Sequence, residues 1–302
     1  MKCALVVGCG YSGERLGGRL LELGYRVVGT TRSEERAALL ESAGIEPLVG
    51  DLQAPGTVAK LAELDAEVVF HLAPPQGEDK EPLAQVLEAV ARPALQAFIY
   101  ASSTSVYGDW GGQWVDETTE VDPASVAGRE RRLAEDAVVE LGDVLGISKR
   151  ICRITGIYGP GRTLRGALES GRYKLISGRD TWVNRVHVDD LVRGLLAAWQ
   201  RGSDGRVYNL VDAEPHRASE FANLAADLHG LAQPDWIGEE EARRIYGEAQ
   251  LRRKLDSKRV RSVRLGAELG VELKYPNYRV GLPAAIAEER EERLTGARRG
   301  RV

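Results

Sequence analysis

The sequence of 302 residues predicts an α/β fold built on a doubly wound parallel sheet. Three observations support this class. A short apolar strand at the N-terminus runs into a glycine turn and a helix. Short apolar strands then alternate with helical segments through the first half of the chain. Apolar residues make up 43% of the sequence, which suffices for a sizeable core in one large domain or two moderate ones.

The N-terminal strand, turn and helix have the pattern of a dinucleotide-binding unit. Leu5, Val6 and Val7 form an apolar run of the kind that is buried in a parallel sheet. The predicted cofactor contacts in the following turn are Gly8, Gly10, Tyr11, Ser12 and Gly13. Gly8 permits the tight turn, Gly10 lets the backbone approach a pyrophosphate, and Gly13 lets the helix pack close to the strand. The pattern therefore predicts a Rossmann-type fold.

The first helix is expected over residues 14–23, with its N-terminal amides and dipole facing the phosphates. Leu16, Leu20 and Leu23 have the spacing of an inward face, and Gly24 ends the helix as a left-handed cap. A second helix begins after Ser33, which is its expected N-cap. Further strands are expected at residues 25–30, 46–49, 67–72, 97–101, 148–155 and 207–210, and further helices from about 57 and at 82–90, 133–141 and 188–200.

Beyond residue 155 the alternation loosens, and the final hundred residues are helical, charged and irregular. This change predicts a smaller, mainly C-terminal substrate domain beside the dinucleotide-binding domain. The expected boundaries are 1–160 and about 184–211 for the dinucleotide-binding domain. The substrate-binding domain is expected at about 161–183 and 212–302.

Composition excludes several classes of function. The formal net charge of −4 and the pI near 5.8 argue against nucleic acid as a main partner. No apolar run reaches membrane-spanning length, and no signal-like segment opens the chain. Cys3, Cys9 and Cys152 lack CxxC spacing and the four histidines are scattered, so we expect buried thiols in a reducing cytoplasm and no metal site. The expected partner is a small molecule, and the expected state is a monomer or homodimer.

The end of the second strand bears on the choice of cofactor. An NAD-specific site usually has an acidic residue there, which bonds the ribose hydroxyls. This chain has Thr30, Thr31 and Arg32 instead. A carboxylate would repel a 2′-phosphate, whereas two hydroxyls and a guanidinium can bind one. The sequence therefore favours NADP(H) over NAD(H), with a solvated charge at the start of a helix as the other interpretation of Arg32.

Later motifs resemble the extended short-chain dehydrogenase/reductase superfamily of the NAD(P)-dependent epimerase/dehydratase type, in its atypical, YeeZ-like branch. The resemblance covers nearly the whole chain, although the first turn is GxGxxG where extended members usually have GxxGxxG. The motifs are Gly50-Asp51-Leu52, His71-Leu72-Ala73, Ser102-Ser103-Thr104-Ser105-Val106-Tyr107-Gly108, Arg153-Ile154-Thr155-Gly156-Ile157-Tyr158-Gly159-Pro160-Gly161, Arg185-Val186-His187-Val188-Asp189-Asp190 and Tyr208-Asn209-Leu210.

The resemblance implies further cofactor contacts. It places Asp51 at the adenine amine with Leu52 beside it, and it places Leu72 and Ala73 along the cofactor groove. For Asp51, a turn or helix N-cap after the third strand is an alternative use of the carboxylate.

The chain departs from the resembled family at its proton relay. In that family a Tyr-xxx-Lys pair delivers a proton, and a Ser or Thr near the end of the fifth strand polarises the substrate oxygen. Counting from both sides places the tyrosine position at Ala127 and the lysine position at Arg131. Ala127 cannot carry a proton, whereas Arg131 keeps the positive charge and can still hold a ribose. Ser103 keeps the position of the polarising hydroxyl, with a strand-end cap as the equal alternative.

Two functions remain open at this point. The first is an NADP(H)-binding oxidoreductase or epimerase-like enzyme acting on a small polar, nucleotide-sugar-like substrate with an unusual acid/base or water. The second is a non-catalytic NADP(H)-binding sensor or regulatory protein. Groups suited to an anionic substrate follow the sixth strand, namely Arg162, Arg165, Arg172, Lys174, Asn184 and Arg185. Their other interpretation is ordinary surface charge.

Overall fold

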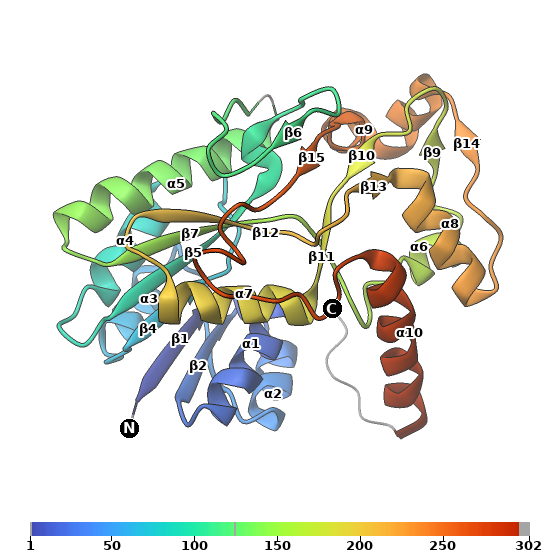
Figure 1. The fold of residues 1–302 in the computed structure, drawn as a ribbon. Coiled ribbons are helices and arrows are strands. Elements are labelled where there is room, and N and C mark those ends of the chain that lie inside the picture. The colour runs from blue at the N-terminus through green and yellow to red at the C-terminus, as the bar shows by residue number, and fades with distance from the viewer. Residues whose placement is uncertain (1, 124, 296–302) are drawn as a thin grey trace.

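A central sheet of seven parallel strands forms the middle of the molecule in the computed structural model, which describes residues 2–123 and 125–295. The strand order is β3-β2-β1-β4-β5-β7-β12, so the chain winds outward in both directions from β1 (Figure 1). This confirms the doubly wound parallel sheet. The strands are β1 (Cys3–Val7), β2 (Arg26–Thr31), β3 (Glu46–Val49), β4 (Val68–His71), β5 (Ala97–Ser103), β7 (Lys149–Ile154) and β12 (Arg206–Leu210).

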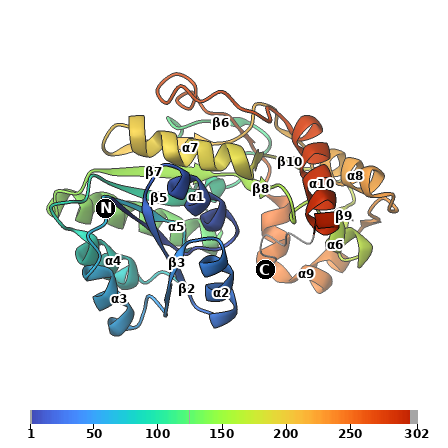
Figure 2. The same ribbon diagram turned by 90° about the horizontal axis from the view of Figure 1, so that it is seen from below.

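Helices cover both faces of this sheet (Figure 2). Side chains of α1, α2 and α7 pack on one face, around Leu16, Leu40 and Leu195. Side chains of α3, α4 and α5 pack on the other, around Leu61, Val86 and Val138. The helices are α1 (Tyr11–Glu22), α2 (Glu34–Ser42), α3 (Pro55–Ala62), α4 (Glu81–Val90), α5 (Val126–Val144) and α7 (Val188–Arg201).

A smaller group of elements, mostly from the second half of the chain, lies beyond the carboxyl ends of the sheet strands. Its apolar centre contains Tyr158, Phe221, Tyr278 and Leu282. Its helices are η1 (Thr104–Tyr107), α6 (Arg165–Glu169), α8 (Ala218–His229), α9 (Glu239–Leu255) and α10 (Tyr278–Thr295). Its short strand pairs are β6 (Trp114–Val115) with β15 (Arg259–Val260), β8 (Gly156–Tyr158) with β11 (Arg185–His187), β9 (Leu175–Ile176) with β14 (Trp236–Ile237), and β10 (Trp182–Val183) with β13 (His216–Arg217).

One stretch after β15 returns to the sheet. Leu265, Leu269 and Val271 are buried in the same core as α1 and α7. The Arg201 guanidinium at the end of α7 donates to the Leu269 carbonyl at 2.6 Å. The C-terminal third of the chain therefore contributes to both units, and the exact boundaries between them stay a prediction.

The first helix differs in detail from its prediction. It begins at Tyr11, three residues before the predicted start, and ends at Glu22. Leu16 and Leu20 are buried as expected, but Leu23 is 50% exposed, so its predicted inward position is wrong. Leu23 follows the last helical residue, where the chain has begun to turn through Gly24 at φ +82°. The helix predicted at 133–141 is also longer. It begins at Val126, because the Ser125 side chain caps it there, and it ends at Val144.

Two local predictions are confirmed. Ser33 caps α2, since its side chain accepts a hydrogen bond from the Arg36 amide at 3.1 Å. The three cysteine thiols are free and buried. Across the part of the chain that the structure describes, we find no helix with the length and apolar character needed to span a bilayer.

Candidate functional site

The glycine turn lies between the ends of β1 and β4. Gly8 has φ +82°, and a Cβ atom there would lie 2.6 Å from the Ala73 nitrogen. Gly13 packs against β1, since a Cβ there would lie 3.1 Å from Val6 Cγ1. A Cβ on Gly10 would meet no protein atom within 4 Å. The turn is therefore tight where it contacts β1 and β4, and open at Gly10, the position predicted to face a pyrophosphate.

Residues from β2 and α2 hold this turn in place. The Gly8 amide donates to the Thr30 hydroxyl at 2.8 Å, and the Cys9 amide donates to the Thr30 carbonyl at 2.8 Å. Thr30 is only 3% exposed. Its oxygen thus supports the turn, and a further bond from its hydroxyl hydrogen to a 2′-phosphate stays a prediction.

Arg36 is a second support for the turn, and the sequence did not single it out. Its guanidinium donates to the Cys9 carbonyl at 3.2 Å and to the Gly10 carbonyl at 3.0 Å, and it pairs with Glu14 at 2.7 Å. The Cys9 carbonyl gains a partner in this way, and the Gly10 carbonyl, which already accepts from the Glu14 amide at 2.9 Å, gains a second one. A long side chain that reaches back over 26 residues leaves no periodic signal, and its place just after the Ser33 cap is the only hint in the sequence.

The residues predicted to choose between NAD and NADP lie at the surface. Thr31 is half-buried, and Arg32 is exposed at the start of α2. On the neighbouring strand end, Asp51 is exposed and accepts a hydrogen bond from the Gln53 amide at 3.0 Å, which is a local turn of the kind weighed as its alternative use. Leu52 is half-buried beside it. Whether Asp51 also binds adenine stays a prediction.

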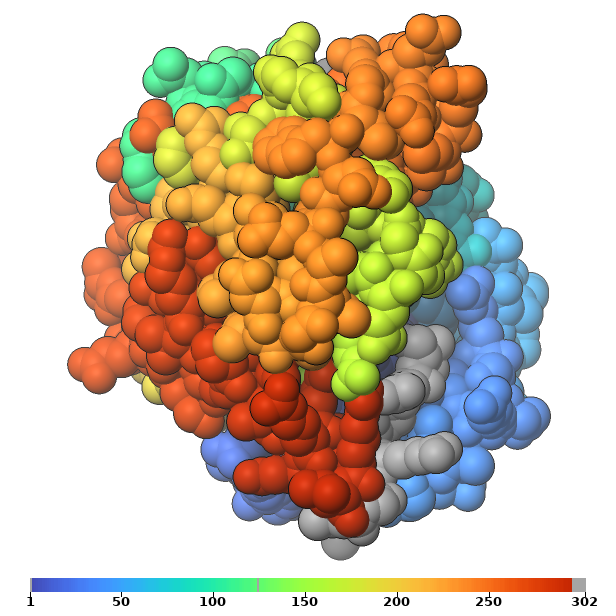
Figure 3. Space-filling model, turned by 90° about the vertical axis from the view of Figure 1, so that its right-hand side faces the viewer, coloured from blue at the N-terminus to red at the C-terminus, as the bar shows by residue number. Residues whose placement is uncertain are grey.

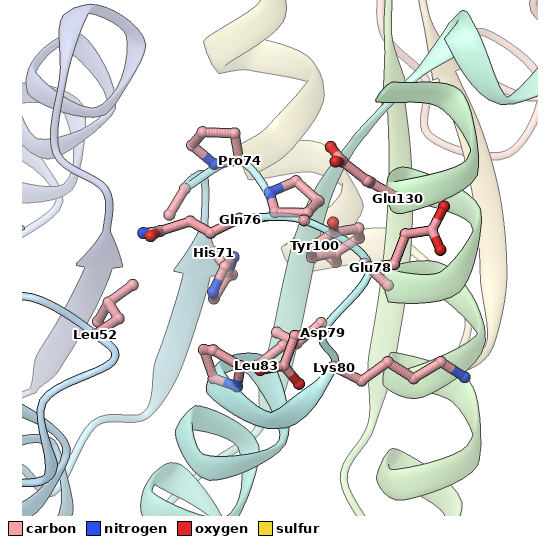
Figure 4. Close-up of a pocket in the computed structure, with 15 residues that line it drawn as sticks. Leu52, His71, Pro74, Gln76, Glu78, Asp79, Lys80, Leu83, Tyr100 and Glu130 are labelled. Carbon is pink, nitrogen blue, oxygen red and sulfur yellow. The ribbon is translucent and has the colours of Figure 1, made fainter. Parts of the chain in front are cut away.

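A pocket opens at the ends of β4 and β5, under the loop that leads to α4 (Figure 4). Leu52 and Ala73 line it, as the resemblance implies for cofactor contacts. Leu72 donates its amide to the Val7 carbonyl at 2.7 Å, which joins this strand end to the glycine turn. The remaining wall includes His71 on β4, Tyr100 on β5 and Glu130 on α5.

His71 and Tyr100 are buried polar groups of this pocket that lack partners. Neither His71 Nδ1 nor the Tyr100 phenol has a hydrogen-bond partner among the described residues. Burial, with the Arg131 charge nearby, lowers the pKa of His71 to about 4, so the ring is neutral at pH 7. Burial raises the pKa of Tyr100 to about 12. These two groups can therefore donate or accept hydrogen bonds to a ligand, but neither is poised to exchange a proton at neutral pH.

Ser103 ends β5, and Arg131 on α5 reaches the same end of this strand. The Arg131 guanidinium donates to the Ala101 carbonyl at 2.5 Å. Ser103 lies two residues further on, where its hydroxyl accepts from the Ser105 amide at 3.2 Å and caps η1. This is the strand-end cap that was the alternative prediction for Ser103, and its hydroxyl hydrogen stays available to a substrate. Ala127, one helical turn before Arg131, is exposed.

A buried network fixes α5 against β5 behind these residues. Glu135 follows Arg131 by four residues and is 3% exposed. It accepts a hydrogen bond from the Ser102 hydroxyl at 2.6 Å, and it pairs with the Arg153 guanidinium through two bonds of 3.0 and 2.7 Å. Because Ser102 and Glu135 neighbour Ser103 and Arg131 in the chain, this network sets the relative position of strand and helix at the site.

Two tyrosines near the strand ends, Tyr107 and Tyr158, could in principle replace the missing phenol, but both are packed in the interior. Tyr107 is fully buried, and its phenol donates to the Asn209 side chain at 2.9 Å. Tyr158 is also fully buried, and its phenol donates to the Asn277 carbonyl at 3.3 Å. Burial raises the pKa of both phenols. Within the described residues, the usual proton relay therefore has no evident replacement at the strand ends.

A large cavity of about 1440 Å³ separates the sheet unit from the smaller unit. Tyr11 of the glycine turn and Arg162 line it, with the Arg162 guanidinium 4.2 Å from the centre of the Tyr11 ring. In Figure 3 the segment around α6 (yellow-green) and α10 (red) lies on the side of the smaller unit that faces the N-terminal helices (blue).

The predicted anion-binding groups separate into three kinds. Arg162, Arg165, Arg172 and Arg185 line the cavity. Lys174 does not line it and pairs with Asp235 at 2.6 Å, and of the four cavity-lining arginines Arg165 pairs with Glu169 at 2.6 Å. The Asn184 side-chain amide donates to the Lys258 carbonyl and accepts from the Val260 amide, so its role is structural.

The parallel sheet, with a glycine turn between β1 and β4, defines a Rossmann-type dinucleotide-binding protein. Residues 4–210 match the model of the NAD dependent epimerase/dehydratase family. The chain belongs to this family.

Relatives of the whole chain agree with this assignment. The chain is similar to the protein YeeZ of Escherichia coli K12, with 30% identity over 294 residues that cover 92% of this chain and 97% of YeeZ. It is also similar to a solved structure described as a functionally unknown conserved protein from Silicibacter pomeroyi, with a TM-score of 0.82, 32% identity, and coverage of 95% and 99%. A third relative is the 4-hydroxy-2-methyl-3-oxo-4-farnesyl-3,4-dihydroquinoline-1-oxide ketoreductase of Stigmatella aurantiaca, with 27% identity over 249 residues that cover 76% of this chain and 74% of the ketoreductase.

Proposed function

We propose that the chain is an NADP(H)-dependent oxidoreductase or epimerase-like enzyme that acts on a small polar, nucleotide-sugar-like substrate. The observation that carries this proposal is that Ser103 and the Arg131 guanidinium both lie at the carboxyl end of β5, which neighbours β4 and, through it, β1 in the sheet. A dinucleotide laid across the ends of these strands would bring its far half to Ser103 and Arg131. Family membership and the ketoreductase relative support hydride chemistry.

In this proposal each residue has a separate role. The turn from Gly8 to Gly13, with Tyr11 and Ser12 inside it, binds the pyrophosphate through its amides and the start of α1. Arg131 binds the ribose near the reacting ring, and the Ser103 hydroxyl donates to the substrate oxygen. Because position 127 is an alanine, it offers no phenol, so a water molecule or a substrate group supplies the proton.

The preference for NADP(H) rests on the surface at the end of β2. Thr31 and Arg32 are accessible there, and the segment Thr30-Thr31-Arg32-Ser33 has no carboxylate to repel a 2′-phosphate. A guanidinium can bind a phosphate with two parallel bonds.

A fluorescence titration of the full chain with NADPH and, separately, with NADH tests this proposal first. We expect saturable binding with NADPH preferred by about ten-fold or more, and a loss of that preference in Arg32→Ala. Lys60→Ala, on an exposed turn of α3, serves as a charge-matched control. If neither nucleotide binds, the proposed function is wrong.

Ala127 favours a second candidate, a non-catalytic NADP(H)-binding sensor. An exposed methyl group stands where the family has its acid, while the cofactor turn is complete. Arg131→Ala and Ser103→Ala separate the two candidates. Loss of NADPH oxidation in a substrate screen supports the enzyme, whereas changes in nucleotide affinity alone, with no turnover in the unmodified protein, support the sensor.

A further inference from the structure

The helix α10 belongs to the smaller unit and forms part of the wall of the cavity between the units. Its residues Tyr278, Leu282 and Ile286 are buried in one cluster with Phe221 of α8. Further along the helix, Glu289 lines the cavity. This packing joins α10 to α8, whereas its position relative to the sheet unit depends on contacts that cross from one unit to the other.

Arg15 of α1 makes one of these crossing contacts. Its guanidinium pairs with Glu288 of α10 at 2.8 Å and with Asp189, at the start of α7, at 3.0 Å. The Arg15 side chain is 14% exposed, so water and salt screen these pairs only in part. Arg15 lies one helical turn after Tyr11, at the end of α1 that is predicted to face the pyrophosphate. The contact with α10 therefore starts from the first turns of the cofactor-binding helix.

Tyr11 makes a second crossing contact, from inside the glycine turn itself. The Arg162 guanidinium lies 4.2 Å from the centre of the Tyr11 ring, close enough for a cation–π interaction. A Cβ atom on Gly159 would lie 2.6 Å from the Tyr11 phenol oxygen, so the phenol packs directly on the main chain there. The glycine turn is thus in contact with the loop 159–163 of the smaller unit.

The same loop is held by α10. Glu289 accepts hydrogen bonds from the Gly161 amide at 2.5 Å and from the Thr163 hydroxyl at 3.0 Å. Glu289 directly follows Glu288, which pairs with Arg15. Two consecutive residues of α10 are therefore joined to the start of α1, one through Arg15 and the other through the loop 159–163.

We infer that nucleotide binding at the glycine turn is coupled to the docking of α10 on the sheet unit, with Arg15 and Tyr11 as positioning residues. This inference rests on the proposed function, because it needs a nucleotide at the turn. A bound pyrophosphate orders the first turns of α1, which places Arg15 for its pair with Glu288. By reciprocity, a docked α10 raises the affinity of the turn for nucleotide by the same factor. Because Glu289 lines the cavity, the shape of the substrate cavity then depends on whether the cofactor is bound.

Fluorescence titration with NADPH of Arg15→Ala, Glu288→Gln and the double variant tests this coupling. We expect each single variant to bind NADPH about five-fold more weakly, and the double variant no more than about five-fold, because all three lose the same pair. Glu288→Gln is the decisive variant. Loss of a negative charge would by Coulomb attraction alone strengthen the binding of an anionic nucleotide, whereas coupling predicts weaker binding. The matched controls are Arg19→Ala and Glu22→Gln, which break an exposed ion pair further along α1 and should change affinity less than about two-fold.

Amide hydrogen exchange of α10 gives a second readout. NADPH should slow the exchange of α10 about five-fold in the unmodified chain and in Arg19→Ala, but less than about two-fold in Arg15→Ala and in Glu288→Gln. A pair that only stabilises the fold would change this exchange by the same factor with and without nucleotide.

The outcomes separate this inference from the proposed function. A Glu288→Gln protein that binds NADPH as tightly as the unmodified chain, or more tightly, overturns the inference alone, as does exchange of α10 that NADPH leaves unchanged. If only NADH binds, the proposed function is wrong, and the same variants titrated with NADH decide the coupling. A chain that binds neither nucleotide overturns both. If Arg15→Ala fails to fold by circular dichroism, Glu288→Gln decides.

Discussion

Gly8 offers the sharpest test of the cofactor turn, because its substitution has a calculable cost. In Gly8→Ala the new methyl group would lie 2.6 Å from the Ala73 nitrogen and 2.8 Å from its Cα. Backbone atoms cannot rotate away, so β1 and β4 must separate at this point. A φ of +82° costs an alanine about 1–2 kcal/mol, and overpacking adds about 1–3 kcal/mol. We expect the free energy of unfolding to fall by about 2–5 kcal/mol, and NADPH binding to be lost.

Two other glycines of the same segment are matched controls. In Gly10→Ala the methyl group meets no protein atom within 4 Å, so stability should change by less than about 0.5 kcal/mol while NADPH affinity falls about ten-fold or more. Gly18→Ala, inside α1 with open space around it, should gain about 0.5–1 kcal/mol and bind NADPH normally. Urea unfolding and NADPH titration of the three variants give these values. A Gly8→Ala protein as stable as the unmodified chain would refute the reasoning.

Three further predictions concern the strand ends and the buried charges. Ala127→Tyr restores the phenol of the family and should raise turnover about 10²–10⁴-fold without changing NADPH affinity. Ala127→Phe, which lacks the hydroxyl, should leave turnover unchanged, and equal rates for both variants would contradict this prediction. Glu135→Gln leaves Arg153 buried without its anion and should lower the free energy of unfolding by about 3 kcal/mol in a urea titration, while Glu140→Gln on the same helix should change it by less than about 0.5 kcal/mol. The raised pKa of Asp212, about 8 when folded, means that the folded protein holds a proton that the unfolded chain loses near pH 4. Burial raises this pKa, so stability from this group is lost as pH rises from about 4 to 8, and Asp212→Asn should gain on the order of 3–4 kcal/mol relative to the unmodified chain between pH 5 and pH 8. A constant difference across that range would contradict the assignment of Asp212.

The sequence predicted the parts of this molecule that depend on local pattern. Apolar runs and glycine spacing located the sheet strands, the turn at Gly8 and the cap at Ser33, because each of these follows from a few consecutive residues. Leu23 failed for a local reason, since the helix ends one residue before it.

Contacts between distant parts of the chain could not be predicted in this way. Arg36 reaches the glycine turn from another helix, and Lys254 reaches the Lys174 carbonyl only because α9 folds back against residues 172–174. Side chains of this length carry no periodic signal, and an arginine or lysine in a charged segment has the same sequence pattern whether it is solvated or buried. The resemblance to a known family supplied Asp51 and Ala73 but said nothing of these supports.

The return of residues 265–271 to the core beside α7 has a consequence for how the chain is made. A growing chain completes the last sheet strand, β12, before α8 and α9 are synthesised, and Leu265, Leu269 and Val271 come only afterwards. Until they leave the ribosome, an apolar strip beside α7 is open to water or to other nascent chains. The sheet half of the molecule therefore cannot complete its core ahead of the rest. A ribosome that stalls between α8 and β15 would release a chain whose sheet strands are paired but whose core beside α7 is still uncovered.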